Sequence, residues 1–522
     1  MTIMTNLDSH KYGDRHLRSD LGGRLNSLDP TSIRRVRLAA TDVISKTFAG
    51  QHILWMLSNL LARQYAVIHE IHISVPSIPV MPSIALFGEG VDLPTTLRNT
   101  IQSIAGSYVS IHTDDEQSCP AVDAEVLVGR ENTTNRECRF QVSVWANGWN
   151  IYVGRKEKTP TALPDSPLSF GPYFGACIAA GEVFKFLRGL KEGRGKHIDS
   201  LFMSLWDFKE YERLEYLPQP KSVTPIALPP CYLIGAGAVG QAAAAALATS
   251  DGVRGTFIVI DNDTVDDTNL NRYPLATLKD VGAAKSILLS DHLRAKGFEA
   301  YPSQTTWPEY AYQLSHSMLP SHLQDREAQY RYDLVLSCVD KNEARHAIQK
   351  FWPKYILGGS TKDMGIAVAA YDMLSEYECL MCNNPLNLDN ATIERVAEEV
   401  KRLSPELRRS LAAKLGADVT AVENYLAHPR CGHLGEQEIM KFRDTNPGAE
   451  WSVGFVSVGA GTLLAAQLVR YALLGQKTLL ENGNTMRLSF LNPSPRFSKH
   501  LRKEGCECST GGRNSYTSAW SK

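Results

Sequence analysis

Apolar and polar residues alternate along this chain with two different periods. Short apolar runs lie at 232–234 and 257–260, a third begins at Leu334, and each has the length of a buried strand. An alanine-rich segment follows the first run, and its composition favours a helix. Strands and helices that alternate in this way, to about Val368, predict a mostly parallel sheet covered on both faces, which is an α/β fold.

The first third of the chain repeats this pattern in a weaker form. Residues 36–40 suit a strand, 51–63 carry apolar residues at helical spacing, and 71–75 alternate as a strand does. The small-residue segment 175–187 also resembles the segment 458–473. We therefore expect two doubly wound halves produced by an internal duplication, with chance similarity of the two small-residue segments as the alternative. The first half lacks a glycine-rich turn, so we expect it to bind no nucleotide.

Prolines mark the boundary between the halves, because five of the fifteen residues in 216–230 are proline. Such a segment suits an extended connector without regular structure. We expect an inactive half at 1–215, a linker at 216–230 and an active half in two pieces at 231–387 and 432–510. A helical insertion at 388–431 separates these two pieces, and a tail follows at 511–522.

The insertion reads as three short helices. Ile393, Val396 and Val400 fall on one helical face. Ser404 and Pro405 are suited to begin a second helix. Gly416 is expected to end this second helix, and Asp418 is expected to cap the third. The apolar residues expected on one face of the second helix are Leu407, Leu411 and Leu415.

Charge and composition exclude several classes of function. The net charge of 522 residues is −1, which provides no basic field for nucleic acid or anionic lipid. The one long uncharged run, 451–469, contains too many small and polar residues for a membrane span, so a buried helix is expected. The first fifteen residues lack an apolar targeting segment. We expect a cytoplasmic protein with no nucleic-acid or membrane partner.

The first strand of the active half runs into the sequence GAGAVG, which contains Gly235, Gly237 and Gly240. A glycine turn into a helix lets backbone amides meet phosphate oxygens at the helix N-terminus. Asp261 follows the next strand, where a nucleotide fold places a carboxylate for a ribose hydroxyl. These features alone also fit a nicotinamide dinucleotide.

A group of charged and polar residues then separates the two kinds of nucleotide. Two cations and two acids stand among them, and the group is Asp263, Asn269, Arg272, Lys285 and Asp340. A dinucleotide enzyme needs no such group. A nucleoside triphosphate with magnesium does, because several negative charges must be neutralised when its α-phosphate is attacked.

Four segments in this order, GAGAVG, IDNDTVDDTNLNRY, DVGAAK and LVLSCVDKNEAR, resemble the adenylation domain of ubiquitin-activating E1 enzymes and their ThiF and MoeB relatives in bacteria. The resemblance covers most of 229–510 and implies a Rossmann-like fold that binds ATP. It implies that Asp261 holds the ribose, Arg272 and Lys285 the phosphates and Asp340 the magnesium, while Asn269 shapes the pocket. Tyr273 departs from the pattern, since the family usually has glutamine there.

The resemblance extends to the segment KYGDRHLR, in which Arg15 matches an arginine that reaches across an interface into the partner's nucleotide site. This implies that Arg15 contacts phosphate. A solvated surface arginine is the alternative.

Four of the ten cysteines form two close pairs, Cys379 with Cys382 and Cys506 with Cys508. Four thiolates suit a closed, structural zinc site. The resembled bacterial enzymes carry two such pairs, although the second pair is one residue shorter here. Free thiols are the alternative.

Cys431 stands apart from these pairs, between Arg430 and His433, where positive charge favours the thiolate. In the resembled family a cysteine in this segment receives the activated carrier protein as a thioester, which implies that Cys431 is the catalytic nucleophile. A metal site with His433 and an inert thiol are the alternatives.

Together these features predict an E1-like enzyme. With ATP and Mg²⁺ it would adenylate the C-terminal glycine of a ubiquitin-like protein, capture it on Cys431 and pass it to an E2-like partner. The layout most resembles E1 proteins of bacterial ubiquitin-like conjugation operons linked with antiphage defence. The main alternative is a sulfur-carrier adenylyltransferase without conjugation, and an oxidoreductase and a binding scaffold are more distant ones. The identity of the carrier and the oligomeric state stay open.

Overall fold

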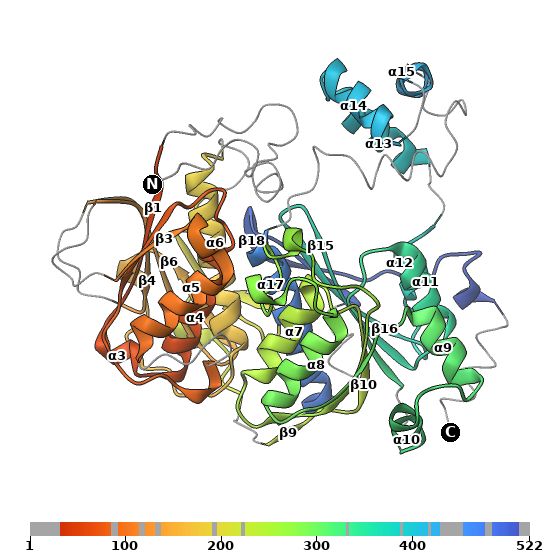
Figure 1. The fold of residues 1–522 in the computed structure, drawn as a ribbon, viewed down its shortest axis with the longest axis horizontal. Helices are drawn as coiled ribbons and strands as arrows, with labels where there is room; N and C mark the ends of the chain where they lie inside the picture. The colour runs from red at the N-terminus through yellow and green to blue at the C-terminus, as the bar shows by residue number, and fades with distance from the viewer. Residues whose placement is uncertain are drawn as a thin grey trace.

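The computed structural model describes eleven segments of the chain, 32–84, 92–113, 121–130, 137–190, 196–220, 225–329, 333–386, 390–415, 419–427, 453–475 and 483–510. Most of these residues belong to two eight-stranded sheets and the helices that pack on them (Figure 1).

The first sheet has the strand order β3-β2-β1-β4-β5-β6-β7-β8. Its strands are β1 (Arg35–Ala40), β2 (Glu70–Ser74), β3 (Ser110–Thr113), β4 (Val122–Val128), β5 (Cys138–Asn147), β6 (Asn150–Gly154), β7 (Ser200–Ser204) and β8 (Lys209–Tyr211). Its helices are α3 (Asp42–Ser45), α4 (Phe48–Ala62), α5 (Leu93–Ala105) and α6 (Phe170–Leu187).

The second sheet has the order β13-β12-β10-β14-β15-β16-β17-β18. Its strands are β10 (Cys231–Ile234), β12 (Thr256–Ile260), β13 (Glu299–Ser303), β14 (Leu334–Ser337), β15 (Tyr355–Lys362), β16 (Gly365–Asp372), β17 (Thr485–Ser489) and β18 (Asn492–Ser498). The accompanying helices are α7 (Ala238–Ala248), α8 (Lys285–Ala295), α9 (Trp307–Ser315), α10 (Ser321–Gln329), α11 (Asn342–Lys350), α12 (Leu380–Asn383) and α17 (Gly454–Leu474).

The two sheets share one topology. In each, five parallel strands are followed by three antiparallel strands, and the strand that comes first in the chain lies third in the order. Helices α4 and α7 follow these first strands, and α6 and α17 occupy matching places before the last two strands. The prediction of two Rossmann-like, doubly wound halves is therefore confirmed.

Helices cover both faces of the second sheet, as expected. Side chains along β10 point alternately to the two faces. Leu233 packs in the large core shared with α7, α8 and α17, while Tyr232 and Ile234 pack with Trp307 and Tyr310 of α9. This alternation explains why a strand of four apolar residues contributes to two separate cores.

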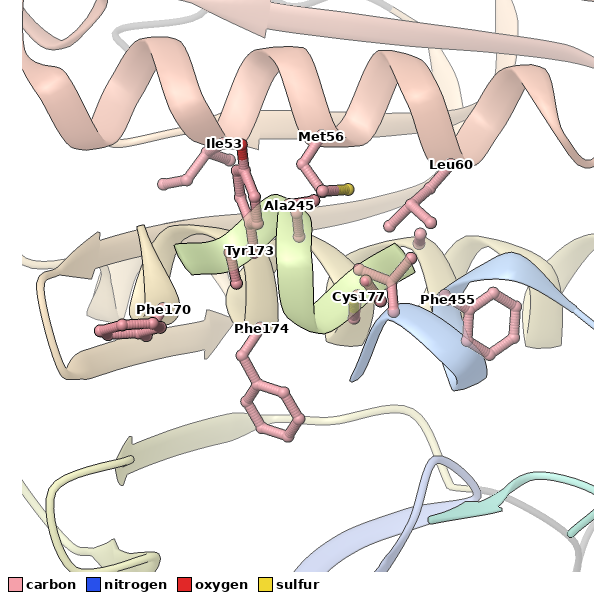
Figure 2. Close-up of a cluster of buried hydrophobic side chains, with 14 of the residues drawn as sticks. Ile53, Met56, Leu60, Phe170, Tyr173, Phe174, Cys177, Ala245 and Phe455 are labelled. Carbon is pink, nitrogen blue, oxygen red and sulfur yellow. The ribbon is translucent and has the colours of Figure 1, made fainter. Parts of the chain in front are cut away.

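The core between the halves is built from four helices. In Figure 2, Ile53 of α4 lies next to Tyr173 of α6, Met56 lies next to Ala245 of α7, and Leu60 lies on the side of Cys177 of α6 and Phe455 of α17. Glycine permits the close approach of α17 to α7, because a Cβ at Gly461 would overlap Ala242 and the carbonyl of Val239. The small-residue helices thus join the two halves into one core.

Within the described segments, α17 is the one helix long and apolar enough to cross a membrane. Its most apolar stretch is 83% buried inside the protein, against α6, α7 and the second sheet. The burial agrees with the expected core helix.

Two local expectations were wrong. The proline-rich connector is not free of regular structure, because β9 (Ile226–Ala227) pairs in parallel with β11 (Val253–Arg254). Leu407 does not share the apolar face of its helix, since it is 49% exposed, whereas Leu411 and Ala412 are buried.

The insertion forms the three expected helices, α13 (Asn390–Lys401), α14 (Pro405–Leu415) and α15 (Val419–Ala427). They share a small core of their own that includes Val396, Val400 and Tyr425, and they stand apart from both sheets (Figure 1). Ser404 begins α14 as expected, because its hydroxyl accepts a hydrogen bond from the amide of Leu407. Gly416, Asp418 and the side chains of Ile393 and Leu415 lie outside the described residues.

His52 gives the fold a pH dependence. It is fully buried in α4, where its ring nitrogens contact Ser83 and Tyr173, and burial, with a smaller effect of Lys296, lowers its pKa to about 3. The unfolded chain takes up this proton below its usual pKa near 6.5 and the folded chain does not, so stability falls as the pH drops below about 6.5. We expect His52 to account for about 2 kcal/mol of the stability lost between pH 6.5 and pH 5.

Urea unfolding at pH 7, 6 and 5 measures this effect. His52→Gln, which retains hydrogen bonding but not titration, should flatten the pH dependence. Equal pH dependence of the variant and the native protein would contradict the assignment.

Candidate functional site

The glycine turn between β10 and α7 is fixed by close backbone contacts. Gly235 has a φ of +96°, and a Cβ there would lie 2.9 Å from the carbonyl of Cys338, after β14. A Cβ at Gly240 would overlap the carbonyl oxygen of Gly235. These two positions therefore require glycine for the turn itself.

The third glycine leaves the N-terminus of α7 open. Gly237 is the N-cap residue, no side chain caps the helix there, and the nearest atom to a Cβ at this position would be the hydroxyl of Tyr273 at 3.4 Å. The first amides of a helix lack intrahelical partners and carry partial positive charge. The turn is thus suited to bind an anionic group.

Asp261 is placed beside this turn by the next strand, β12. Its carboxylate accepts hydrogen bonds from the amides of Ala236 at 2.7 Å and of Asp263 at 2.9 Å. Burial raises the pKa of Asp261, and these two amide hydrogen bonds oppose the rise. The carboxylate is held in one orientation at the carboxyl edge of the sheet, and each oxygen retains a further lone pair for a hydroxyl donor.

Two cations lie near one aromatic ring. The Nζ of Lys285 is 5.5 Å from the centre of the Tyr273 ring, and the guanidinium of Arg272 is 5.3 Å from it. Both distances are within the range of cation–π attraction. Tyr273, which is buried, therefore brings together the two predicted phosphate ligands beside the glycine turn.

Lys285 begins α8 and forms an ion pair with Asp263 at 2.9 Å. Its side chain is 9% exposed, while that of Asp263 is 63% exposed. Burial lowers the pKa of Lys285, but Tyr273 and Asp263 outweigh this effect and the pKa is raised. Lys285 therefore stays positively charged and close to the turn.

The remaining predicted residues lie at the same edge but differ in their contacts. Arg272 donates to the carbonyl of Thr268 and to the side chain of Asn271, both at 2.8 Å. Asn269 is buried, and its side chain accepts from the amide of Asp266 in a capping box, so it shapes the loop from within. Asp340 is exposed and follows β14, which pairs with β10. It therefore lies at the edge of the sheet where Gly235 and Asp261 lie.

Two residues of the first half that were not predicted from the sequence contact this region. Asn59 and Arg63 lie on α4 and at its end, and both donate hydrogen bonds to the backbone of the loop that carries Arg272. The only signal in the sequence is a pair of polar residues four apart in an apolar helix. That signal cannot be distinguished from a solvated face.

The four paired cysteines come together, as expected. The Sγ–Sγ distances are 3.8 Å for Cys379 and Cys382, 3.7 Å for Cys379 and Cys506, and 3.3 Å for Cys382 and Cys508. Four thiolates at Zn–S bonds of about 2.3 Å in a tetrahedron are about 3.8 Å apart. The amide of Lys503 also donates to Cys382 at 3.5 Å. The positions of the four sulfur atoms therefore fit a zinc ion, even though the second cysteine pair is one residue shorter than in the resembled bacterial enzymes.

Two predicted site residues, Arg15 and Cys431, lie outside the described residues, as do the neighbours Arg430 and His433. Their predicted roles stay predictions.

Two families of known proteins match this chain, one over each of the two sheets. A model of the ThiF family matches residues 228–509, and a model of the BilD N-terminal domain matches residues 35–205. The first match spans the glycine turn, the cations and all four paired cysteines. The second spans β1 to β7.

Curated proteins of two kinds are similar to this chain in sequence. Uncharacterized protein y4jF of Sinorhizobium fredii is 22% identical over 356 residues, which cover 63% of this chain and 64% of that protein. Adenylyltransferase and sulfurtransferase uba4 of Aspergillus fumigatus is 31% identical over 142 residues, 27% of each protein. The similarity thus spans less than two thirds of each relative.

Among solved structures, E. coli MccB with ATP is similar at 14% identity and a TM-score of 0.35, over 54% of this chain and 66% of that one. E. coli MccB with MccA-N7isoASN has a TM-score of 0.36 at 15% identity. At these scores the likeness adds nothing to the fold described above.

Proposed function

Because the chain belongs to the ThiF family, we propose that its second half binds ATP at the glycine turn and uses it to adenylate a carboxylate. The observation that carries the proposal is that Lys285 and Arg272 both lie within 5.5 Å of the Tyr273 ring, beside the uncapped N-terminus of α7. Two cations at this place match a triphosphate, whereas a redox dinucleotide carries only a diphosphate.

Each residue has a role in this proposal. The amides at Gly237 and the two cations hold the phosphates, while Asp261 accepts from a ribose hydroxyl. Asn269 keeps the loop in shape. The exposed carboxylate of Asp340 suits a hard cation such as Mg²⁺, which when bound supplies further positive charge to the phosphates.

The chemistry is a substitution at the α-phosphorus. A carboxylate oxygen forms the new P–O bond, and the bond between the α-phosphorus and its bridging oxygen breaks to release pyrophosphate. Lys285 and Arg272 offset the charge that develops on the phosphoryl oxygens and the leaving group. The product is an acyl adenylate, a mixed anhydride whose carbonyl carbon is open to attack.

We further propose that the carboxylate is the C-terminal glycine of a ubiquitin-like protein and that Cys431 takes it up. The thiolate would attack the acyl carbon, the C–O bond to AMP would break, and the resulting thioester would pass to an E2-like partner. The separate helical module α13 to α15, which directly precedes the segment of Cys431, supports this reading. We also propose that the domain boundaries are those expected from the sequence. The same proposal includes a cytoplasmic location and a place in a defence operon.

The second candidate is a sulfur-carrier adenylyltransferase that forms no thioester on Cys431. The name of the fungal relatives, adenylyltransferase and sulfurtransferase, favours it. Both candidates share adenylation and differ in the step that follows.

Cys431→Ala separates them. With ATP, Mg²⁺ and candidate ubiquitin-like proteins, the variant is expected to keep ATP–pyrophosphate exchange within about two-fold, because the thiol acts only after adenylation. The adduct that the native protein gives on a non-reducing gel should disappear completely.

Cys138→Ala is the control, because Cys138 lies on β5 of the first half, away from the site. It should retain both exchange and adduct. A native protein that exchanges but forms no reducible adduct supports the sulfur-carrier alternative. If the native protein shows ATP–pyrophosphate exchange with none of the carboxylate substrates, adenylation itself is contradicted.

A further inference from the structure

We propose that Asn59 and Arg63, which belong to the first half, are positioning residues for the nucleotide site of the second half. They hold the loop 270–276, on which Arg272 and Tyr273 lie. The inference rests on the proposed function for its effect on catalysis, and on the described contacts alone for its effect on the loop.

The contacts join residues more than 200 positions apart in the chain. Arg63 donates through Nη1 to the carbonyl of Leu270 and through Nη2 to the carbonyl of Ala276 at 2.9 Å. Its Nε donates to the side chain of Asn59 at 2.8 Å, and Asn59 donates onward to the carbonyl of Pro274 at 3.0 Å. Three carbonyl groups of one short loop are therefore bound by two side chains of α4 and its C-cap.

Both side chains are fully buried, with no solvent-exposed surface. Burial lowers the pKa of Arg63 to about 9, which leaves the guanidinium charged near neutral pH. Its planar group presents several donors in a fixed geometry, so one side chain can bind two carbonyls at the two ends of the loop. A lysine is a single point charge and cannot reproduce this arrangement.

The loop that they hold carries Arg272 and the aromatic ring that contacts Lys285. Tyr273 has its hydroxyl near the Cβ position of Gly237, and its ring contacts both Lys285 and Arg272. Gly454, the first residue of α17, packs at this place too, because its Cβ would lie 3.3 Å from the carbonyl oxygen of Asn271 and 3.5 Å from Cδ of Arg63. A displacement of the loop would move Arg272 and the ring relative to the glycine turn, and the ring would lose its contact with Lys285.

This arrangement gives the first half a task in catalysis. In the described residues 32–84 no glycine-rich turn joins β1 to the helices that follow it, yet helix α4 fixes the phosphate-binding side of the other half. A misplacement of about 1 Å in reacting groups costs about 100-fold in rate. We therefore expect Arg63→Met in the full-length chain to lower kcat/KM for ATP in the exchange reaction by about 10- to 100-fold.

Arg37→Met is the matched control, because Arg37 is also a buried arginine of the first half but pairs with Glu125 on β4. Both variants are expected to lower the melting temperature. Only Arg63→Met should change kcat and KM at a temperature where both are folded. Arg63→Lys should recover only part of the activity, and Asn59→Ala should give a smaller loss of the same kind.

Hydrogen exchange of the backbone provides a second readout that needs no activity. The amides of 270–276 should exchange faster in Arg63→Met than in the native protein and the Arg37→Met control. If the native protein shows no ATP–pyrophosphate exchange, the proposed function fails while this measurement still tests the contact. If Arg63→Met matches Arg37→Met both in kcat and KM and in exchange of the loop, the inference is overturned.

Discussion

Replacing Lys285 by alanine is expected to lower the rate of ATP–pyrophosphate exchange by about 100- to 1,000-fold, the usual cost of removing one preorganised group that stabilises charge in a transition state. Lys285 is 9% exposed, is paired with Asp263 and lies over Tyr273, so its ammonium group is oriented before the substrate arrives. Its pKa is raised, so the loss would be seen across the neutral range of pH. Initial rates of exchange at saturating carboxylate substrate measure the effect.

Lys279→Ala is the control for Lys285→Ala. Lys279 carries the same charge six residues earlier in the chain, but it is exposed. It should change the rate by less than about two-fold, because an exposed charge is screened by solvent and salt. A loss below about ten-fold for Lys285→Ala, with the protein folded, would contradict the role of Lys285 at the phosphates.

Loss of the cysteine cluster is the second large effect. Metal analysis of the native protein is expected to give one zinc ion per chain, and Cys382→Ser is expected to give none. Cys382 is nearly fully buried between Cys379 and Cys508, so its replacement removes one ligand from a closed site. A structural zinc site contributes several kcal/mol to folding, and we expect the melting temperature to fall by roughly 10 °C.

Two comparisons make this result specific. Treatment of the native protein with a strong chelator should lower the melting temperature by a similar amount. Cys138→Ala should retain the zinc, because this cysteine lies on β5 in the other sheet. A native protein that contains no zinc after expression in zinc-supplemented medium, and that melts like Cys382→Ser, would show that the thiols are free.

The parts of the fold that were predicted from the sequence depend on local patterns. The turn at Gly235 must be glycine because of its own φ and one backbone contact, so the residue type alone reveals it. The apolar runs of β10, β12 and β14 are buried on both faces, and such strands need no alternation. The cysteine pairs were found because the spacing of metal ligands is itself a signal.

The parts that were not predicted depend on contacts between distant segments. Leu407 fits the helical period of its neighbours, but the small core of the insertion is filled by Ala412 and by residues of α15 instead. Ile226 and Ala227 stand among prolines, yet they find a partner strand in β11. The bonds of Arg63 to loop 270–276 span more than 200 residues, and no local pattern carries such information.

The joining of both halves in one polypeptide, with α6 packed against α17, has a consequence for stoichiometry. When two such halves are separate subunits, they can dissociate in dilute solution, and they can be produced in unequal amounts. Here the tether keeps their ratio at one to one and their effective concentration high. Each chain therefore carries both the loop 270–276 and the residues of α4 and its C-cap that bind it, at any level of expression.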